Sequence, residues 1–110
     1  MKARWLYHAL PRLDWERVGA VYAPESLARE GFVHASHRDR IAESARLYVA
    51  PRGPCVVLRI DPRRVRSRIE IAATPRGPMP HVRGAIPREA IVEATPLEAW
   101  NESEAPDAID

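Results

Sequence analysis

The sequence has one cysteine, no long apolar run and few of the short motifs that identify an enzyme. With Cys55 as the sole cysteine in 110 residues, an intrachain disulfide and a cysteine-based zinc cluster are both excluded. No segment approaches the ~20 apolar residues that a membrane-spanning helix requires, and the N-terminal residues do not resemble a secretory signal. We therefore expect a cytoplasmic protein without a membrane partner.

Motifs for particular chemistries are also missing. There is no glycine-rich phosphate loop of the usual spacing and no Gly-x-Ser-x-Gly nucleophile elbow. No His-x-His or His-x-x-x-His pair brings two metal ligands onto one element. We therefore assign no metal site.

Charge is unevenly distributed along the chain. All 17 basic residues precede residue 98, whereas five of the 15 acids lie at residue 98 or later. A basic body favours anionic partners such as nucleotides, phosphates or RNA, although solvated surface arginine gives the same pattern. Residues 98–110 are acidic and poor in large apolar side chains. We predict one globular domain over residues 1–97, followed by a disordered tail over 98–110.

Apolar spacing predicts a mixed α+β domain. The stretch 31–36 is typical of a buried strand that turns directly into a helix, with Ser36 as the N-cap and Tyr48 on its apolar face. A second helix is predicted over 12–18, and residues 21–27 and 74–80 are predicted to be loops. Strands are predicted at 5–8, 55–60, 65–73, 80–86 and 91–97. Runs of strands with two short helices favour α+β over a regular βαβ wind.

Three of the four histidines lie at predicted strand ends. His8 ends one strand, His34 lies near the end of another, and His81 opens a third. If these ends converge, the imidazoles can bind an anion or move a proton. Ser36 would contribute a hydroxyl, and Arg83 shares a strand face with His81, a pairing that suits a phosphate or carboxylate. A structural role for each residue remains an equally open alternative.

Four segments together resemble the family catalogued as domain of unknown function 952. The resemblance covers roughly residues 4 to 97. Members commonly have an aromatic residue where this chain has Arg83. The segments are Leu6-Tyr7-His8, Gly31-Phe32-Val33-His34-Ala35-Ser36, Leu58-Arg59-Ile60-Asp61-Pro62 and Pro80-His81-Val82-Arg83-Gly84-Ala85-Ile86-Pro87.

The resemblance implies an ADP-ribosyltransferase-like fold, with a split, mainly antiparallel sheet and a nucleotide cleft. Tyr7-His8 is similar to the Tyr-His pair that ends the first strand of diphtheria-toxin-like transferases, whose histidine contacts a ribose. Ser44-Ala45 and Tyr48 are similar to their Ser-Ala-x-Tyr helix. Their late-strand glutamate has no clear match here. RNA 2′-phosphotransferases of that fold use histidine and arginines instead.

These patterns support three hypotheses. In the first, the cleft binds a nucleotide or other phosphorylated small molecule, with NAD or a related nucleotide as ligand or substrate. In a catalytic version, His8 positions a ribose hydroxyl, His34 or His81 donates a proton or stabilises an anion, and Arg83 holds phosphate, with Tyr7, Ser36 and Tyr48 as further ligand contacts. The second hypothesis is a non-catalytic binding domain that keeps the fold, and the third is an RNA-binding module. Whether the protein is an enzyme stays open, and a monomer is favoured.

Overall fold

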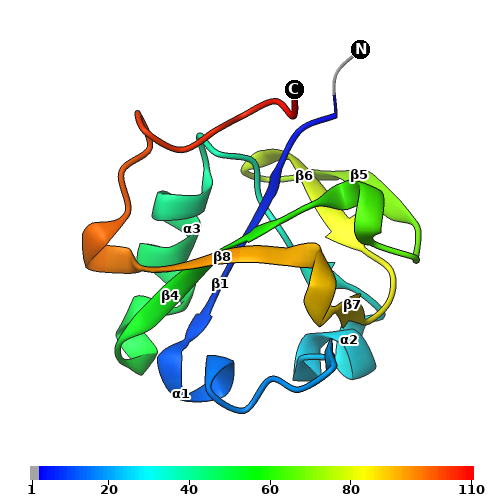
Figure 1. Ribbon diagram of the computed structural model, residues 1–110, viewed down its shortest axis with the longest axis horizontal. Helices are drawn as coiled ribbons and strands as arrows, with labels where there is room; N and C mark the ends of the chain where they lie inside the picture. The colour runs from blue at the N-terminus through cyan, green and yellow to red at the C-terminus, as the bar shows by residue number, and fades with distance from the viewer. Residues whose placement is uncertain (1–2) are drawn as a thin grey trace.

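The computed structural model describes residues 3–110 and contains two three-stranded antiparallel sheets and a small third sheet (Figure 1). The first sheet has the order β1-β4-β8: β1 (Leu6–Pro11), β4 (Cys55–Ile60) and β8 (Ile91–Pro96). The second has the order β3-β6-β5: β3 (Val33–His34), β6 (Gly77–Val82) and β5 (Ile69–Thr74). The third pairs β2 (Val21–Tyr22) with β7 (Ile86–Pro87).

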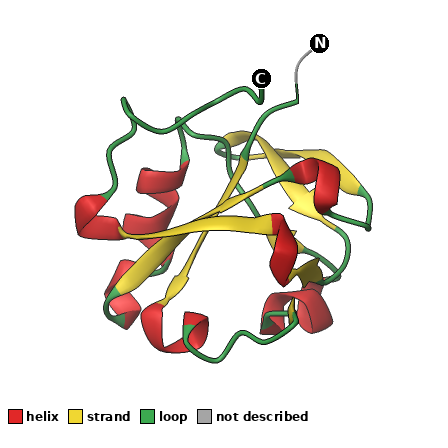
Figure 2. Ribbon diagram, in the orientation of Figure 1, coloured by secondary structure: helices red, strands yellow, loops and turns green. Residues whose placement is uncertain are grey.

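Short helices connect and cover the sheets (Figure 2). The α-helices are α1 (Arg12–Trp15), α2 (Glu25–Glu30) and α3 (Ile41–Tyr48). Single 3-10 turns lie at Ala50–Arg52, Pro62–Arg64, Arg88–Ala90 and Leu97–Ala99. The protein is thus a single α+β domain with antiparallel sheets, as the sequence predicts.

The two larger sheets meet at one short segment. Ser36 forms an isolated antiparallel bridge with Tyr7 of β1, with hydrogen bonds of 2.7 and 2.8 Å. One residue earlier, the N–H of Ala35 donates to the carbonyl of Pro80 in β6 at 3.1 Å. The chain therefore passes from the edge of one sheet to the edge of the other within two residues. Within residues 3–110, no strand pairs with β1 on that side after the bridge.

Side chains of β1 point alternately to the two faces of its sheet, and each face has its own apolar cluster. Leu6 and Leu10 face the larger apolar cluster, which joins the sheets. Tyr7 faces the opposite side, where it packs with Ile41 of α3 and Val57 of β4. Because successive strand residues point to opposite faces, His8 lies on the same face as the two leucines.

Two prolines in β6 lie where they cost no hydrogen bond to β5. The N–H of Arg83 donates to the carbonyl of Arg68 at 2.9 Å, so odd-numbered residues of β6 bond to β5 and even-numbered ones face β3. Pro78 and Pro80 are even-numbered. A proline is tolerated in a strand when its nitrogen points away from the ladder, which explains a strand where the sequence predicts a loop over 74–80. Only Pro75 and Arg76 form the turn.

Three further local expectations are corrected. Ser36 is not an N-cap: its backbone is held in the bridge to Tyr7, and α3 starts five residues later at Ile41. The helix predicted over 12–18 ends already at Trp15. The segment predicted as a loop at 21–27 contains β2 and the start of α2, a helix that ends at Gly31 in the left-handed conformation that glycine favours (φ 84°).

The acidic segment 98–110 differs from the disordered tail predicted for it. The Trp100 ring packs edge-on against Tyr7, with centroids 5.0 Å apart. Near the chain end, the N–H of Ile109 donates to the carbonyl of Ala3 at 2.8 Å, and the Ile109 side chain is buried. Trp100 and Ile109 thus hold this segment on the domain, although its acidic composition predicts disorder.

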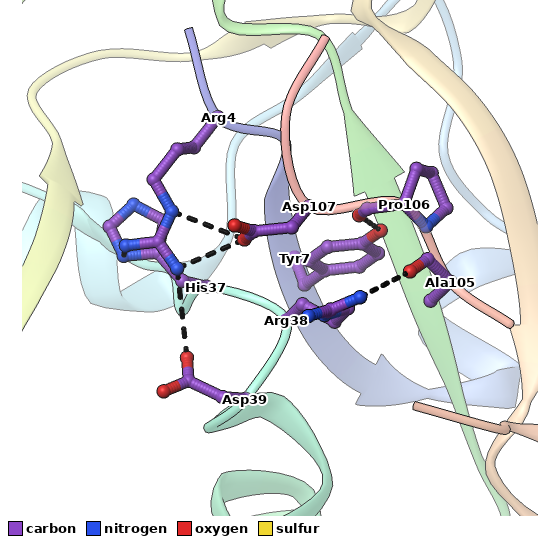
Figure 3. Close-up of polar contacts among 8 residues, drawn as sticks. All are labelled: Arg4, Tyr7, His37, Arg38, Asp39, Ala105, Pro106 and Asp107. Atoms are coloured by element: carbon purple, nitrogen blue, oxygen red, sulfur yellow. Dashed lines mark hydrogen bonds and ion pairs between the residues drawn. The ribbon is translucent and has the colours of Figure 1, made fainter. Parts of the chain in front are cut away.

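Polar contacts fix the same segment across β1 (Figure 3). Arg4 donates through Nε and Nη2 to one carboxylate oxygen of Asp107, at 3.1 and 2.9 Å. The Tyr7 hydroxyl donates to the carbonyl of Pro106, and Arg38 donates to the carbonyl of Ala105 at 3.2 Å. The first and last parts of the described chain therefore lie side by side.

Candidate functional site

A cleft of about 1040 Å³ opens along the free edge of β1, beyond the Tyr7–Ser36 bridge. Its walls come from α2, α3, β3 and the β5–β6 turn. Among the residues proposed from sequence, the cleft is lined by His8, His34, Ser36, Tyr48 and His81. The convergence of the three histidines is therefore present, whereas Tyr7 and Arg83 are not among the lining residues.

His8 is a buried, doubly hydrogen-bonded imidazole on the cleft floor. Its side chain is 8% exposed. Nδ1 lies 2.5 Å from the carbonyl oxygen of His34, and Nε2 lies 2.7 Å from the hydroxyl of Tyr22. Because a carbonyl only accepts, Nδ1 carries the proton and Nε2 accepts from Tyr22. Burial lowers the pKa of His8 to about 4, against a smaller raising effect of the bond to His34. His8 is neutral at pH 7.

Ala9 presents free backbone groups to the cleft. The N–H and C=O of Tyr7 point toward Ser36, away from β4. In an antiparallel strand every second residue points the same way, so the N–H and C=O of Ala9 point to the same open edge. Neither group has a hydrogen-bond partner within residues 3–110. The floor next to His8 thus offers one donor and one acceptor side by side.

His34 and His81 form an aromatic group with Phe32 at the rim. The rings of Phe32 and His81 stack with centroids 3.8 Å apart and an angle of 12°. His34 packs against both rings and donates from Nε2 to Glu30 at 2.6 Å. Burial, followed by the electrostatic effects of His34 and Arg83, lowers the pKa of His81.

The other end of the cleft carries an arginine that sequence reasoning overlooked. Arg76, in the β5–β6 turn, donates through Nη1 to the Ser44 hydroxyl at 2.8 Å and pairs through Nε with Glu43 at 3.0 Å. The hydrogen bond from Arg76 lowers the pKa of Glu43. Ser44 also lies 3.3 Å from the Ser36 hydroxyl. The Arg76 guanidinium stands 5.7 Å from the Tyr48 ring centroid.

Further charges line the rim near α1 and α2. Arg52 lies 4.0 Å from Asp14, and Arg29 pairs with Glu25 at 3.1 Å. The Arg17 side chain has no hydrogen bond or ion pair to any residue of the described chain. The rim can therefore supply positive charge to an anion from more than one side.

Tyr7 and Arg83 have other surroundings. The Tyr7 side chain is fully buried on the opposite face of the sheet, against the ring of Trp100. Its burial raises the pKa of the hydroxyl to about 12. Arg83 donates to Glu70 at 2.5 Å and stands 5.4 Å from the Phe32 ring centroid, outside the cleft lining.

Sequence reasoning missed Tyr22, Arg76 and the backbone of Ala9. Tyr22 and Arg76 lie in segments predicted to be loops, and backbone groups carry no sequence signal unless the strand order is known. No group of three or more His, Cys, Asp or Glu side chains within residues 3–110 is placed to hold a metal ion. In the same range no helix has the length and apolar character needed to cross a bilayer.

Comparison with known proteins supports the fold and assigns the family. The crystal structure of protein CC0527 from Caulobacter crescentus, a structural genomics target, has a TM-score of 0.72 and 17% sequence identity, with 84% of each chain covered. A double mutant of that protein gives the same values. No curated protein matches. Residues 9–94 match the family described as protein of unknown function, DUF952. The resemblance seen in the sequence is thus confirmed, and the chain belongs to the DUF952 family.

Proposed function

We propose that the cleft binds a nucleotide or another phosphorylated small molecule, in a split-sheet domain of the ADP-ribosyltransferase-like kind. The observation that carries this proposal is the free N–H and C=O of Ala9 beside the neutral His8–Tyr22 pair, with arginines on the rim. Ala9 is partly buried, and its unpaired N–H and C=O at the strand edge are available to a ligand that offers one acceptor and one donor.

The floor suits a planar group with an adjacent donor and acceptor. A carboxamide or the edge of a nucleobase offers such a pair, and it would extend β1 as another strand does. NAD carries both a carboxamide and an adenine. His8 orients its neighbours here, because its own ring nitrogens are already bonded to His34 and Tyr22.

The Arg76 end suits the anionic part of the ligand. A guanidinium binds phosphate through two parallel hydrogen bonds. In this structure the N–H groups of Arg76 donate to Glu43 and Ser44 instead. A phosphate would replace Glu43 and keep the Ser44 hydroxyl within reach. Arg17 and Arg52 would add longer-range attraction from the opposite rim.

The same geometry favours binding without turnover. A general acid or base must exchange a proton with the ligand, yet both nitrogens of His8 already have protein partners and the pKa of His8 is about 4. His81 has no hydrogen bond from its ring to another residue of the described part, and it would be the proton acceptor in a catalytic version. The non-catalytic alternative is therefore supported by the two protein hydrogen bonds that occupy the ring nitrogens of His8.

A ligand screen with matched variants tests the proposal. Purified protein is heated with NAD, ADP-ribose, nicotinamide, nucleoside phosphates and inorganic phosphate. A ligand at a hundred times its Kd should raise Tm by about 10 °C. Arg76→Gln should weaken binding of a phosphorylated ligand about tenfold or more, whereas Arg46→Gln, an exposed change on α3 outside the cleft, should not.

Two outcomes would contradict the proposal. A flat screen would exclude these ligands, and equal losses in Arg76→Gln and Arg46→Gln would show that the cleft does not hold the anion. Product analysis by chromatography addresses the chemistry separately. Steady conversion of a bound ligand would overturn the non-catalytic interpretation and direct attention to His81.

A further inference from the structure

The outer edge of β5 is an open, unprotected strand edge. Because Arg83 donates to the carbonyl of Arg68, the even-numbered residues of β5 bond to β6. The N–H and C=O groups of Ile69, Ile71 and Ala73 therefore point outward. None of them bonds to another residue within 3–110, and β6 is the only element there with which β5 makes extensive contact.

The edge of the other large sheet is protected in ways that β5 is not. β8 has a register irregularity opposite Arg59 and Ile60, carries Glu93, and ends in Pro96. Bulges, charges and prolines are the features that keep natural sheet edges from pairing. β5 has neither bulge nor proline, and Ile71 on it is 57% exposed. An exposed β-branched residue on an open edge is suited to a partner strand.

We propose that β5 pairs antiparallel with β5 of a second copy of this chain, with Ile71 on the two-fold axis. In this register Ile71 opposes its counterpart, and Ile69 opposes Ala73 of the other copy. All three are outward-pointing residues, so each such pair exchanges two backbone hydrogen bonds. The second sheets of the two copies become one continuous sheet with an isologous interface.

Neighbouring registers are less favourable. A shift that puts the axis at Glu70 sets two carboxylates directly opposite each other, which is destabilising. The opposite shift, with the axis at Ala72, sets Ile69 against Pro75, which has no N–H to donate. In the register centred on Ile71, Glu70 opposes Ala72, and its charge is already matched by Arg68 at 3.0 Å and Arg83 at 2.5 Å.

The axis of this dimer lies away from the cleft. Ile71 lines a separate groove of about 580 Å³ with Arg4 and Arg40, and of the β5 residues only Thr74, at the strand end, lines the cleft around His8. This proposal does not rest on the function proposed for the cleft.

Sedimentation equilibrium over a concentration series tests the proposal. The wild-type mass should rise from 12.4 kDa toward twice that value as concentration increases. Ile71→Lys, which places two ammonium groups on the axis, should stay monomeric with an unchanged far-UV circular dichroism spectrum. Val92→Lys is the matched control, because Val92 is 41% exposed on the β8 edge, and this variant should associate as the wild type does.

A cross-linking variant keeps the test independent of the lysine substitution. Ile71→Cys should form a disulfide-linked dimer under mild oxidation, since directly opposed strand residues lie at about the distance that a disulfide spans. Val92→Cys should not, and Cys55 is buried. A mass of 12.4 kDa up to about 1 mM would overturn the proposal. The same mass with an unrelated extended peptide bound at the edge would overturn it in favour of a foreign strand.

Discussion

The buried imidazole of His8 predicts a specific loss of stability at mildly acidic pH. In the unfolded chain a histidine protonates near pH 6.5, whereas in the folded protein the pKa of His8 is about 4. As pH falls from 6.5 toward 4, the unfolded chain binds a proton at His8, whereas the folded protein does not. Stability contributed by the neutral ring is therefore present above pH 6.5 and lost as pH falls toward 4.

The size of the effect follows from the two pKa values. A tenfold change in a protonation equilibrium corresponds to about 1.4 kcal/mol, so the complete loss is about 3 kcal/mol, of which about 2 kcal/mol has gone by pH 4.5. Full conversion is justified because the ring is buried against β4 and Tyr22. Carboxylates with lowered pKa, such as Asp61 and Glu70, add their own losses at lower pH.

Urea unfolding at pH 7 and pH 4.5 measures this loss. We expect wild type to lose about 2 kcal/mol more between these pH values than His8→Gln, whose amide cannot titrate and can still donate to the His34 carbonyl. Each protein is compared with itself at two pH values, so the cost of the substitution cancels. Arg46→Gln, an exposed change on α3, should keep the wild-type slope. Equal slopes in wild type and His8→Gln would refute the reasoning.

Three substitutions test packing. Tyr7→Phe should lower the free energy of unfolding by about 1–2 kcal/mol, because the Pro106 carbonyl loses its donor in a buried site. Trp100→Ala should cost about 2 kcal/mol and make residues 98–110 sensitive to protease, because the ring covers Tyr7. Gly84→Ala should cost about 1–3 kcal/mol, because its Cβ would lie 2.7 Å from the Cβ of Ser67. Urea unfolding at pH 7 measures all three.

Matched variants separate these effects from general perturbation. Tyr48→Phe changes a ring that is 61% exposed, Glu102→Ala an exposed acid of the same C-terminal segment, and Gly19→Ala a glycine with no atom near the added methyl. Each should change stability by less than about 0.5 kcal/mol. Losses as large as those of the corresponding test variants would contradict the packing argument.

Strands and helices with a clear local pattern of apolar residues could be predicted from the sequence. Segments whose conformation is set by contacts with distant parts of the chain could not. The apolar run at Cys55–Ile60 predicted strand β4. The prediction that His8 ends the first strand is wrong, because β1 continues to Pro11. Ser36, by contrast, has every local feature of an N-cap. It is used for the bridge to Tyr7, since two backbone bonds between sheets outweigh one local side-chain bond.

In the candidate site, too, only part of the arrangement could be predicted from local sequence. The sequence predicted that three histidines converge, and His8, His34 and His81 do line one cleft, although His8 lies within β1 and not at its end. Tyr7 and His8 were treated together, yet adjacent strand residues face opposite sides, and the side that Tyr7 faces depends on where α3 and Trp100 pack. In the proposed function Arg76 makes the phosphate contact that the sequence predicted for Arg83. Sequence alone could not place Arg76, because the turn that brings it to Ser44 depends on the pairing of β5 with β6.

The pairing between the two ends of the chain has a consequence for synthesis. Arg4 bridges with Ala108, and Trp5 bonds to the carbonyl of Asp107 at 2.8 Å. A ribosome adds about 5–20 residues per second, so roughly 5–20 s pass between the synthesis of Arg4 and that of Ala108. During that interval Tyr7 has no cover from Trp100. A chaperone that recognises exposed aromatic side chains would bind Tyr7 in the nascent chain and would lose this site once Trp100 packs against it.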